Sequence, residues 1–219
     1  MTFPASKAEA SKDKLESEPS IKVDIHLFHC GQGDTVLLNL LGKKWVLIDC
    51  NLPKGQIRNE FFRHVSSLGI KRLDLVCLTH PHDDHYTGME EVLRYFNAEG
   101  RSIGMYCVGA VEPRLIHTWM KRRNCPKSSA LAYERLNKYV DELLKSKPPR
   151  IKLFSADANS RPVIVADDSG EVQLHPIAPS PSESRTVLQE TFLLGRAKDK
   201  LNKLSIVLAL LIRSKKRRI

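Results

Sequence analysis

The chain has 219 residues, of which 42% are hydrophobic and 27% are charged, the balance of an ordinary globular protein. Its longest strongly apolar stretch, residues 204–212, is far shorter than the roughly 20 residues that cross a bilayer as a helix, which excludes a membrane-spanning helix. The net charge of +10 predicts attraction to polyanions such as nucleic acid, although a merely solvated basic surface would give the same charge.

The N-terminal segment and the cysteines indicate the domain boundary and the redox environment. Residues 1–20 are charged throughout and contain no apolar run, which predicts a disordered lead rather than a secretory signal, followed by one domain over residues 21–219. The five cysteines are scattered without a CxxC pair, and most lie in or beside apolar runs. We therefore expect a reducing, cytoplasmic setting rather than a disulfide framework.

The first third of the domain has the pattern of a β-meander followed by a helix and a buried strand. Short apolar runs rich in Val, Ile and Thr are separated by Gly-containing turns. Apolar residues then recur at helical spacing over residues 57–68, just before Gly69. We predict that four strands lie in one sheet, at residues 25–28, 36–40, 46–48 and 75–78.

Beyond this region, strands and helices alternate. Residues 81–88 form a polar loop, and the segments 89–100 and 128–147 have helical patterns, the second stopped by Pro148. Strands are predicted at 102–111, 150–156, 163–167, 171–178 and 204–212, with a Ser-, Pro- and charge-rich loop at 179–203. Helices packed on sheets predict an α/β layered sandwich.

The loop after the buried strand carries the most informative motif. Residues 80–85 read His-Pro-His-Asp-Asp-His and match the pattern H-x-H-x-D-H. Alternate side chains of an extended backbone share a face, so His80 and His82 can hold one ion together. Asp84 and His85, in the turn that follows, can reach a second ion beside it. The alternative is a surface loop that is His-rich by chance.

The residue types of this motif indicate hydrolysis. Imidazoles and a carboxylate suit Zn²⁺ and also Mn²⁺ or Fe, and a divalent ion lowers the pKa of bound water from near 16 toward about 7. Water is therefore the predicted nucleophile, and a pair of ions could clamp a phosphoryl or an acyl centre. Asp84 is the residue that we expect to serve in catalysis as well as in metal binding.

The motif, the strand before it and the helix after it resemble the metallo-β-lactamase superfamily. Residues 29–49 are similar to a branch related to the competence protein ComEC, whose members carry D-V-G-Q-G-D-S before two strands that end in I-D-x-G. The residues at 31–34, Gly-Gln-Gly-Asp, match that pattern. Three positions depart from it: His29 replaces Asp, Thr35 replaces Ser, and Asn51 replaces the final Gly.

The resemblance implies an αββα sandwich with two divalent ions, zinc first among them, at one edge. It places His80 and His82 on one ion and Asp84 and His85 on the other. Asp49 would orient these ligands through hydrogen bonds, or would only cap the turn that follows it. The loop of Gln32 and Asp34 would rim the site, while the glycines at 31 and 33 could equally form a plain β-turn.

The same branch has further ligands that this chain does not clearly offer. Its pattern includes an intermediate His, a bridging Asp after a hairpin that begins with an N-x-x-S strand, and a final His. Asn202 and Ser205 fit the start of that strand, but no such Asp or His follows. His117 is a candidate for the intermediate His, or an ordinary structural histidine, and His175 reads as a strand residue. The resemblance thus predicts the N-terminal part of the fold without its C-terminal portion, or a shortened form, with residues 206–212 near a sheet edge.

Three functions remain open on this basis. Basic runs at 121–127 and 214–218, together with the resemblance, favour a hydrolase of phosphodiester bonds, in particular a nuclease. An acyl or thioester hydrolase of small substrates is the alternative within the same superfamily, because fold does not fix function. A non-catalytic binding module, which the missing ligands would favour, belongs to a different class.

Overall fold

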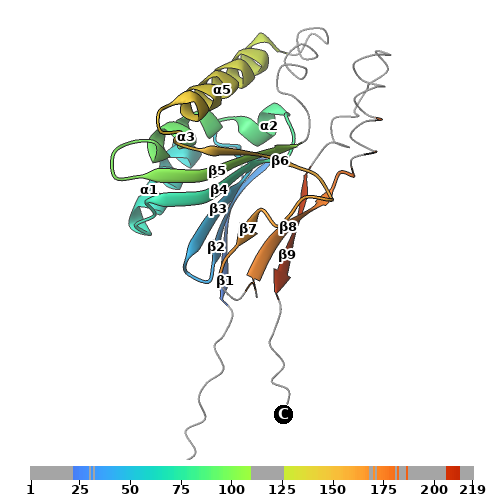
Figure 1. The fold of residues 1–219 in the computed structure, drawn as a ribbon. Helices are drawn as coiled ribbons and strands as arrows, with labels where there is room; N and C mark the ends of the chain where they lie inside the picture. Colours follow the sequence, from blue (N-terminus) through green and yellow to red (C-terminus); the bar gives the residue numbers. More distant parts are fainter. Residues whose placement is uncertain are drawn as a thin grey trace, which may run out of the picture.

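Two β-sheets and a layer of helices make up the protein, seen here in a computed structural model (Figure 1). The structure describes residues 22–109 except 30 and 32, residues 126–180 except 168, 169 and 171, the single positions 182 and 186, and residues 206–212. The predicted disordered lead at 1–20, His117, most of the predicted loop at 179–203 and the basic run at 214–218 lie outside these described residues.

The larger sheet has six strands in the order β1-β2-β3-β4-β5-β6. β1, β2 and β3 form an antiparallel meander, and β4, β5 and β6 continue it in parallel. The prediction that the first four strands share one sheet is confirmed. Their bounds are β1 Val23–His29, β2 Asp34–Leu40, β3 Lys44–Ile48, β4 Arg72–Leu78, β5 Ser102–Gly109 and β6 Lys152–Ala156.

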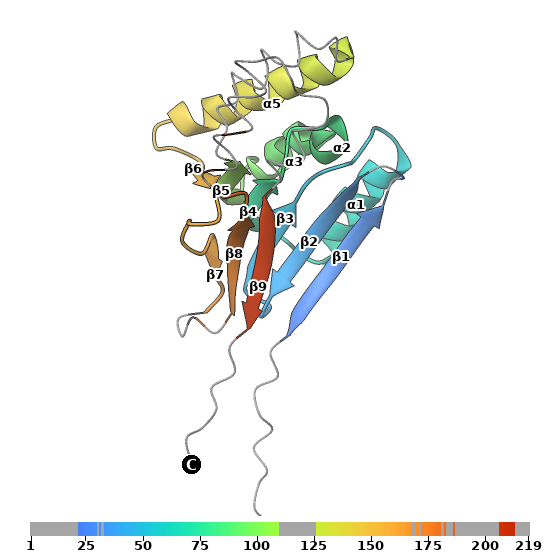
Figure 2. The ribbon, with the colours of Figure 1, turned by 90° about the vertical axis from the view of Figure 1, so that its right-hand side faces the viewer.

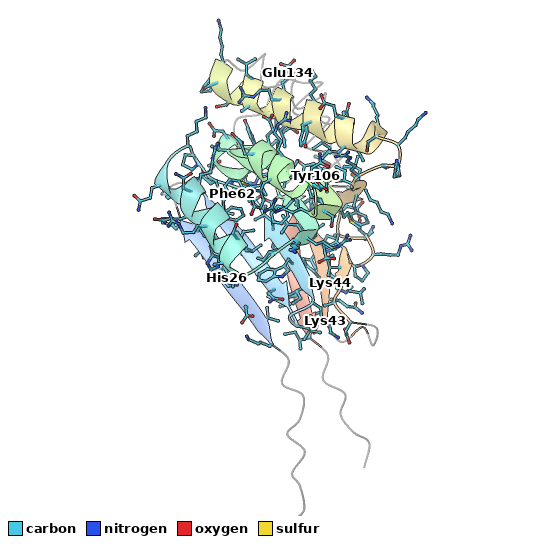
Figure 3. All side chains as sticks on the ribbon, turned by 90° about the vertical axis from the view of Figure 1, so that its left-hand side faces the viewer. His26, Lys43, Lys44, Phe62, Tyr106 and Glu134 are labelled. Carbon is cyan, nitrogen blue, oxygen red and sulfur yellow. The ribbon has the colours of Figure 1, made fainter. Side chains whose placement is uncertain are left out.

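Helices cover one face of this sheet. They are α1 Gln56–Ser67, α2 Asp83–Tyr86, α3 Met89–Phe96 and α5 Lys127–Lys145. Figure 3 views the molecule from the side of these helices and labels Phe62 on α1, Glu134 on α5 and Tyr106 on β5. Tyr106 is 1% exposed, and its hydroxyl lies against the sulfur of Met89. The amphipathic pattern of residues 57–68 and 128–147 thus reports helices that bury one side on the sheet.

The short helix α2 differs from the predicted loop at 81–88. A helix of four residues is too short to produce a visible apolar period, so the pattern could not reveal it. Its start is stabilised locally, because the carboxylate of Asp83 accepts a hydrogen bond from the backbone N–H of Asp84 at 3.1 Å. The two aspartates also lie at the positive end of the helix dipole.

The smaller sheet packs on the opposite face of the larger one and contains β7 Ile164–Val165, β8 Val172–Ala178 and β9 Val207–Ile212. β9 pairs with β8 alone within the described part of the chain and is one of the two outer strands of this sheet (Figure 2). Val207 and Ile212 are 47% and 46% exposed. The prediction of an edge strand at 206–212 is therefore confirmed.

The two faces of the larger sheet define two cores, because successive side chains of a strand point in opposite directions. Leu37 and Leu47 pack with the helices, whereas Leu38 and Val46 pack with the smaller sheet. The described residues form three layers, helices on a sheet on a second sheet, and they do not include the second helical layer of an αββα sandwich. No helix among them is both long and apolar enough to span a membrane.

Candidate metal centre

The predicted site residues meet at one edge of the larger sheet. β3 and β4 are parallel, so both end at that edge, where Ile48 pairs with Cys77. β2 starts there because it is antiparallel to β3, and β1 ends there, with His29 paired to Asp34. Strand ends of adjacent parallel strands are where α/β folds place functional side chains.

The H-x-H-x-D-H motif occupies the connection from β4 to α2. His82 has an extended backbone and immediately precedes α2, whose first turn is closed by a hydrogen bond from the N–H of His85 to the carbonyl of His82 at 2.9 Å. Asp83 is held from above, since its carboxylate accepts a hydrogen bond from Ser129 of α5 at 2.8 Å. The helix end of the motif is therefore held both by its own first turn and by α5.

The four predicted ligands lie together. The ring centroids of His80 and His82 are 4.8 Å apart, and those of His80 and His85 are 3.8 Å apart. His85 Nε2 is 3.7 Å from Asp84 Oδ2. Two ligands of one tetrahedral zinc ion are separated by about 3.4 Å, given metal–ligand distances of roughly 2.0–2.2 Å. The His85–Asp84 pair thus has nearly the spacing of two ligands across an ion.

The prediction that two of these side chains bind each of two ions stays a prediction. Within the part of the chain that the structure describes, no three His, Cys, Asp or Glu side chains are arranged to hold one ion. His80 instead packs its ring against the ring of His85. The donor types and the spacing of the His85–Asp84 pair fit a divalent ion.

Asp49 connects the ends of three elements. Its Oδ1 accepts a hydrogen bond from the backbone N–H of Thr79 at 2.7 Å, and its Oδ2 accepts one from the Thr79 hydroxyl at 2.6 Å. Oδ2 also lies 2.7 Å from Nδ1 of His85. These contacts reach β4 and α2 rather than the turn after Asp49, which favours the orienting role over turn capping.

This arrangement leaves Nε2 of His85 as the nitrogen that faces Asp84. A carboxylate on one ring nitrogen fixes the tautomer and the direction of the other, which is how metal-binding histidines are commonly supported. Asp49 itself is 7% exposed and adopts a left-handed backbone conformation, with φ 54°. Such a conformation is uncommon for a residue other than glycine, and residues held in it cluster at functional sites.

The two neighbouring imidazoles have opposite pKa shifts. Burial lowers the pKa of His80 to about 3, with help from the nearby His85 and His82. Burial also acts to lower the pKa of His85, but the hydrogen bond and charge of Asp49 outweigh it, and the charges of Asp84 and Asp34 add to them, so the pKa of His85 is raised. His80 is therefore neutral near pH 7, which is the form that binds a metal ion.

The loop before β2 packs directly on the motif. Gly33 has φ 76°, and a Cβ at this position would lie 2.3 Å from the carbonyl oxygen of Asp84. Asn51 fixes the loop, because its side chain donates to the carbonyl of Gly33 at 3.2 Å and its N–H donates to the buried Thr35 hydroxyl at 2.8 Å. Gly33 thus serves a close approach, whereas Gly31 has open space around it and fits a plain turn.

The remaining predicted residues divide between the described and undescribed parts of the chain. Asp34 lies at this rim and contacts His29, while Gln32 and His117 lie outside the described residues. His175 is a strand residue of β8 whose Nε2 lies 2.7 Å from the side-chain oxygen of Gln173.

Sequence reasoning missed several residues that build the site. Thr79 directly precedes the H-x-H-x-D-H motif, and Asn51 occupies the last position of the I-D-x-G pattern. Their places in these motifs were a signal that could have identified both. His29 was visible only as a departure from the ComEC-like pattern. Ser129 had no signal at all, because its contact with Asp83 joins segments far apart in the sequence.

A two-sheet fold with a helical face and a histidine motif at the strand ends defines the metallo-β-lactamase fold class. The chain belongs to the metallo-β-lactamase superfamily, whose family model matches residues 29–181. The predicted mixed α/β fold of this type is therefore confirmed.

Curated proteins similar to this chain are named ribonuclease Z. The protein from Clostridium beijerinckii is 30% identical over 95 residues, which cover 40% of this chain and 29% of that protein. The one from Clostridium tetani is 31% identical over 97 residues, covering 41% of this chain and 29% of the relative. The mitochondrial ribonuclease Z 2 of Schizosaccharomyces pombe is 27% identical over 84 residues, covering 37% and 12%. The chain thus matches less than a third of the length of these relatives.

Among solved structures, the metallo-β-lactamase fold protein YhfI from Bacillus subtilis gives a TM-score of 0.42 at 14% identity, covering 71% of this chain and 52% of that one. The metallo hydrolase Igni18 from Ignicoccus hospitalis gives a TM-score of 0.39 at 14% identity, covering 89% and 58%.

Proposed function

We propose that this chain is a metal-dependent hydrolase of phosphodiester bonds that acts on RNA. The observation that carries the proposal is the joining of Asp49, Thr79 and His85 beside the other residues of the H-x-H-x-D-H motif, in a chain of this superfamily. The partial similarity to ribonuclease Z and the net charge of +10 support a polyanionic substrate.

In this proposal the four predicted ligands, His80, His82, Asp84 and His85, hold two divalent ions, zinc by preference. When bound, such ions supply a hydroxide nucleophile at neutral pH and stabilise charge on the phosphoryl oxygens. Asp49 keeps His85 turned toward the centre. Asp84, whose side chain is 34% exposed, orients the attacking water and accepts its proton.

The finer assignments belong to the same proposal. A reducing, cytoplasmic location is part of the proposal, and the burial of Cys50, Cys77 and Cys107 supports it. Placement in the ComEC-like branch rests on the Gly-Gln-Gly-Asp loop at 31–34. It is a separate likeness from the partial similarity to ribonuclease Z. A bridging carboxylate is not among the residues that converge on the described centre.

One observation favours a second candidate, a binding module that does not catalyse. No three potential ligands among the described residues converge on one point. If metal binding requires a side-chain arrangement that is rarely populated, the apparent affinity for the metal is reduced in proportion to that population. The acyl or thioester hydrolase of the sequence analysis stays open as the third outcome of the test.

Metal analysis combined with parallel substrate assays separates these three functions. The metal-free chain is supplied with Zn²⁺ or Mn²⁺, its metal content is measured, and it is assayed on RNA, DNA, bis(p-nitrophenyl) phosphate and a thioester. We expect metal-dependent cleavage of RNA and of bis(p-nitrophenyl) phosphate.

Matched histidine variants identify the responsible site. His82→Ala should abolish both cleavage and metal uptake, because loss of a ligand severely weakens binding, while His175→Ala on β8 should leave both unchanged. Metal uptake without cleavage of any substrate would establish the binding module, and cleavage of the thioester alone would establish the acyl hydrolase.

A further inference from the structure

A second imidazole–carboxylate pair lies at the site edge, outside the H-x-H-x-D-H motif. His29 Nδ1 is 2.6 Å from Asp34 Oδ1, at the point where β1 ends and β2 begins. The side chains of His29 and Asp34 are 65% and 45% exposed. Among the described residues, no other hydrogen bond of His29 is seen. The imidazole is thus oriented through one nitrogen while its ring remains open to solvent.

The backbone around Asp34 fixes this pair relative to the motif. Gly33, the residue before Asp34, packs so tightly on Asp84 that no side chain fits between them. Thr35, the residue after Asp34, is fully buried and accepts the hydrogen bond from Asn51. Asp34 is therefore held on both sides, and His29 is held by Asp34.

We propose that His29 is the proton donor to the leaving group, with Asp34 as the residue that positions it. The proposal rests on the proposed phosphodiesterase function. A hydrolase that attacks phosphorus with a water-derived nucleophile needs an acid on the leaving side, because an alkoxide is a poor leaving group. The histidines of the predicted ligand set cannot donate a proton from a nitrogen that binds a metal ion, and Asp84 faces the attacking water. His29 is outside this set and is bonded to Asp34, whose preceding residue, Gly33, packs on Asp84.

The step balances without a further reactant. The hydroxyl group of water forms a bond to phosphorus, and Asp84 accepts the proton that water loses. The bond from phosphorus to the leaving oxygen breaks with its electron pair on that oxygen, which takes the proton from Nε2 of His29. Nδ1–H of His29 stays hydrogen-bonded to Asp34 throughout, so the neutral ring keeps its orientation and regains its proton from solvent.

The exposure of the pair makes the test clean. A surface pair of this kind adds little to folding stability, so its removal should leave the fold intact. His29→Gln removes the acid and keeps a polar side chain, and Asp34→Asn removes the charge that positions it. His175→Gln is a matched control on β8, where the imidazole hydrogen-bonds to Gln173 of the same strand.

The experiment compares two phosphodiesters that differ in the need for a proton. Bis(p-nitrophenyl) phosphate releases nitrophenolate, which leaves without protonation, whereas an oligoribonucleotide releases an alkoxide, which requires it. His29→Gln should lower kcat/KM for the oligoribonucleotide by about 10²-fold or more and change that for bis(p-nitrophenyl) phosphate by less than about threefold. His175→Gln should change neither, and the metal content of all variants should equal that of the parent chain.

A readout independent of turnover follows the hydrogen bond itself. In the metal-free protein, ring 15N shifts of His29, read through the carbon-bound ring protons, should show Nδ1 as the protonated nitrogen of the neutral ring, and Asp34→Asn should shift this tautomer balance. Equal losses on both phosphodiesters, or reduced metal content in His29→Gln, would overturn the role of His29 while leaving the phosphodiesterase function standing. If the parent chain binds metal and cleaves neither phosphodiester, the proposed function and the role of His29 both fall.

Discussion

The site edge of the larger sheet and the outer strand β9 of the smaller sheet are stabilised in different ways. At the site edge, polar side chains tie the ends of β2, β3 and β4 to one another and to α2. At β9, the described residues provide backbone bonds on one side, and four of its apolar side chains are 36% to 47% exposed. Precision at the site therefore comes from a few directional contacts, whereas β9 depends on burial that is only partly achieved.

The largest expected effect is at Gly33, where the site edge has no spare space. Gly33→Ala would force its Cβ against the backbone of Asp84 and would also strain a backbone with φ 76°. We expect a loss of about 3 kcal/mol or more in the free energy of unfolding, together with weaker metal uptake. Urea unfolding and metal titration measure the two effects.

Gly31→Ala is the matched control for this substitution. Its φ of 90° imposes backbone strain, but nothing lies within 4 Å of the added Cβ, so we expect a loss of only about 1 kcal/mol. Similar losses for Gly31→Ala and Gly33→Ala would show that the close approach to Asp84 is unimportant.

The next largest effect concerns Asp49. Asp49→Asn removes the charge that Thr79 and His85 contact, and we expect a loss of about 2 kcal/mol in the metal-free protein at acidic to neutral pH. The pKa of His85 should fall, because the interaction that raises it is gone. NMR titration of the imidazole measures the pKa, and an unchanged value would refute the orienting role.

The pH dependence of this effect has a defined sign. A histidine with a raised pKa binds more protons in the folded state than in the unfolded state. The stability that His85 gains from Asp49 is therefore fully present below its ordinary pKa of 6.5 and is lost as the pH rises through its folded-state value. The difference in unfolding free energy between parent and Asp49→Asn should accordingly be larger at pH 5.5 than at pH 9.

The smallest effect on stability is expected at β9. Leu210 is 37% exposed, so Leu210→Lys should change the free energy of unfolding by about 0.5 kcal/mol or less. A charge on an apolar edge strand opposes pairing with another chain, so any self-association of the protein should weaken. Sedimentation velocity tests this, and a loss of stability comparable to that of Asp49→Asn would contradict the contrast drawn above.

The sequence predicted the strands and the longer helices well because burial leaves a period in the chain. The apolar runs of β2 and β4 reflect burial on both faces of the larger sheet, and both strands were predicted. The meeting of Asp49 with the motif was also within reach, since parallel strands end at one edge of a sheet. The short helix α2 left no period, so it was missed.

Side-chain geometry at the site could not be predicted in the same way. Nothing in the motif shows that His80 packs on the ring of His85 instead of joining it around a common point. The opposite pKa shifts of these two residues depend on burial and on the distance to Asp49, which are properties of the folded chain. The pairing of His29 with Asp34 could have been found from the register of the β1–β2 hairpin, had that register been known.

Among the described residues, one backbone hydrogen bond joins the start of β9 to the site edge. The N–H of Ile206, just before β9, donates to the carbonyl of Thr79 at 2.9 Å, directly before His80. Ile206 and Thr79 are far apart in sequence, whereas the contacts of the β1–β3 meander are local. Closing a long loop is entropically costly, so contacts of long sequence separation are expected to form late. The meander can therefore assemble early in folding, and the strand end that carries the histidine motif acquires its last backbone partner only when the smaller sheet arrives.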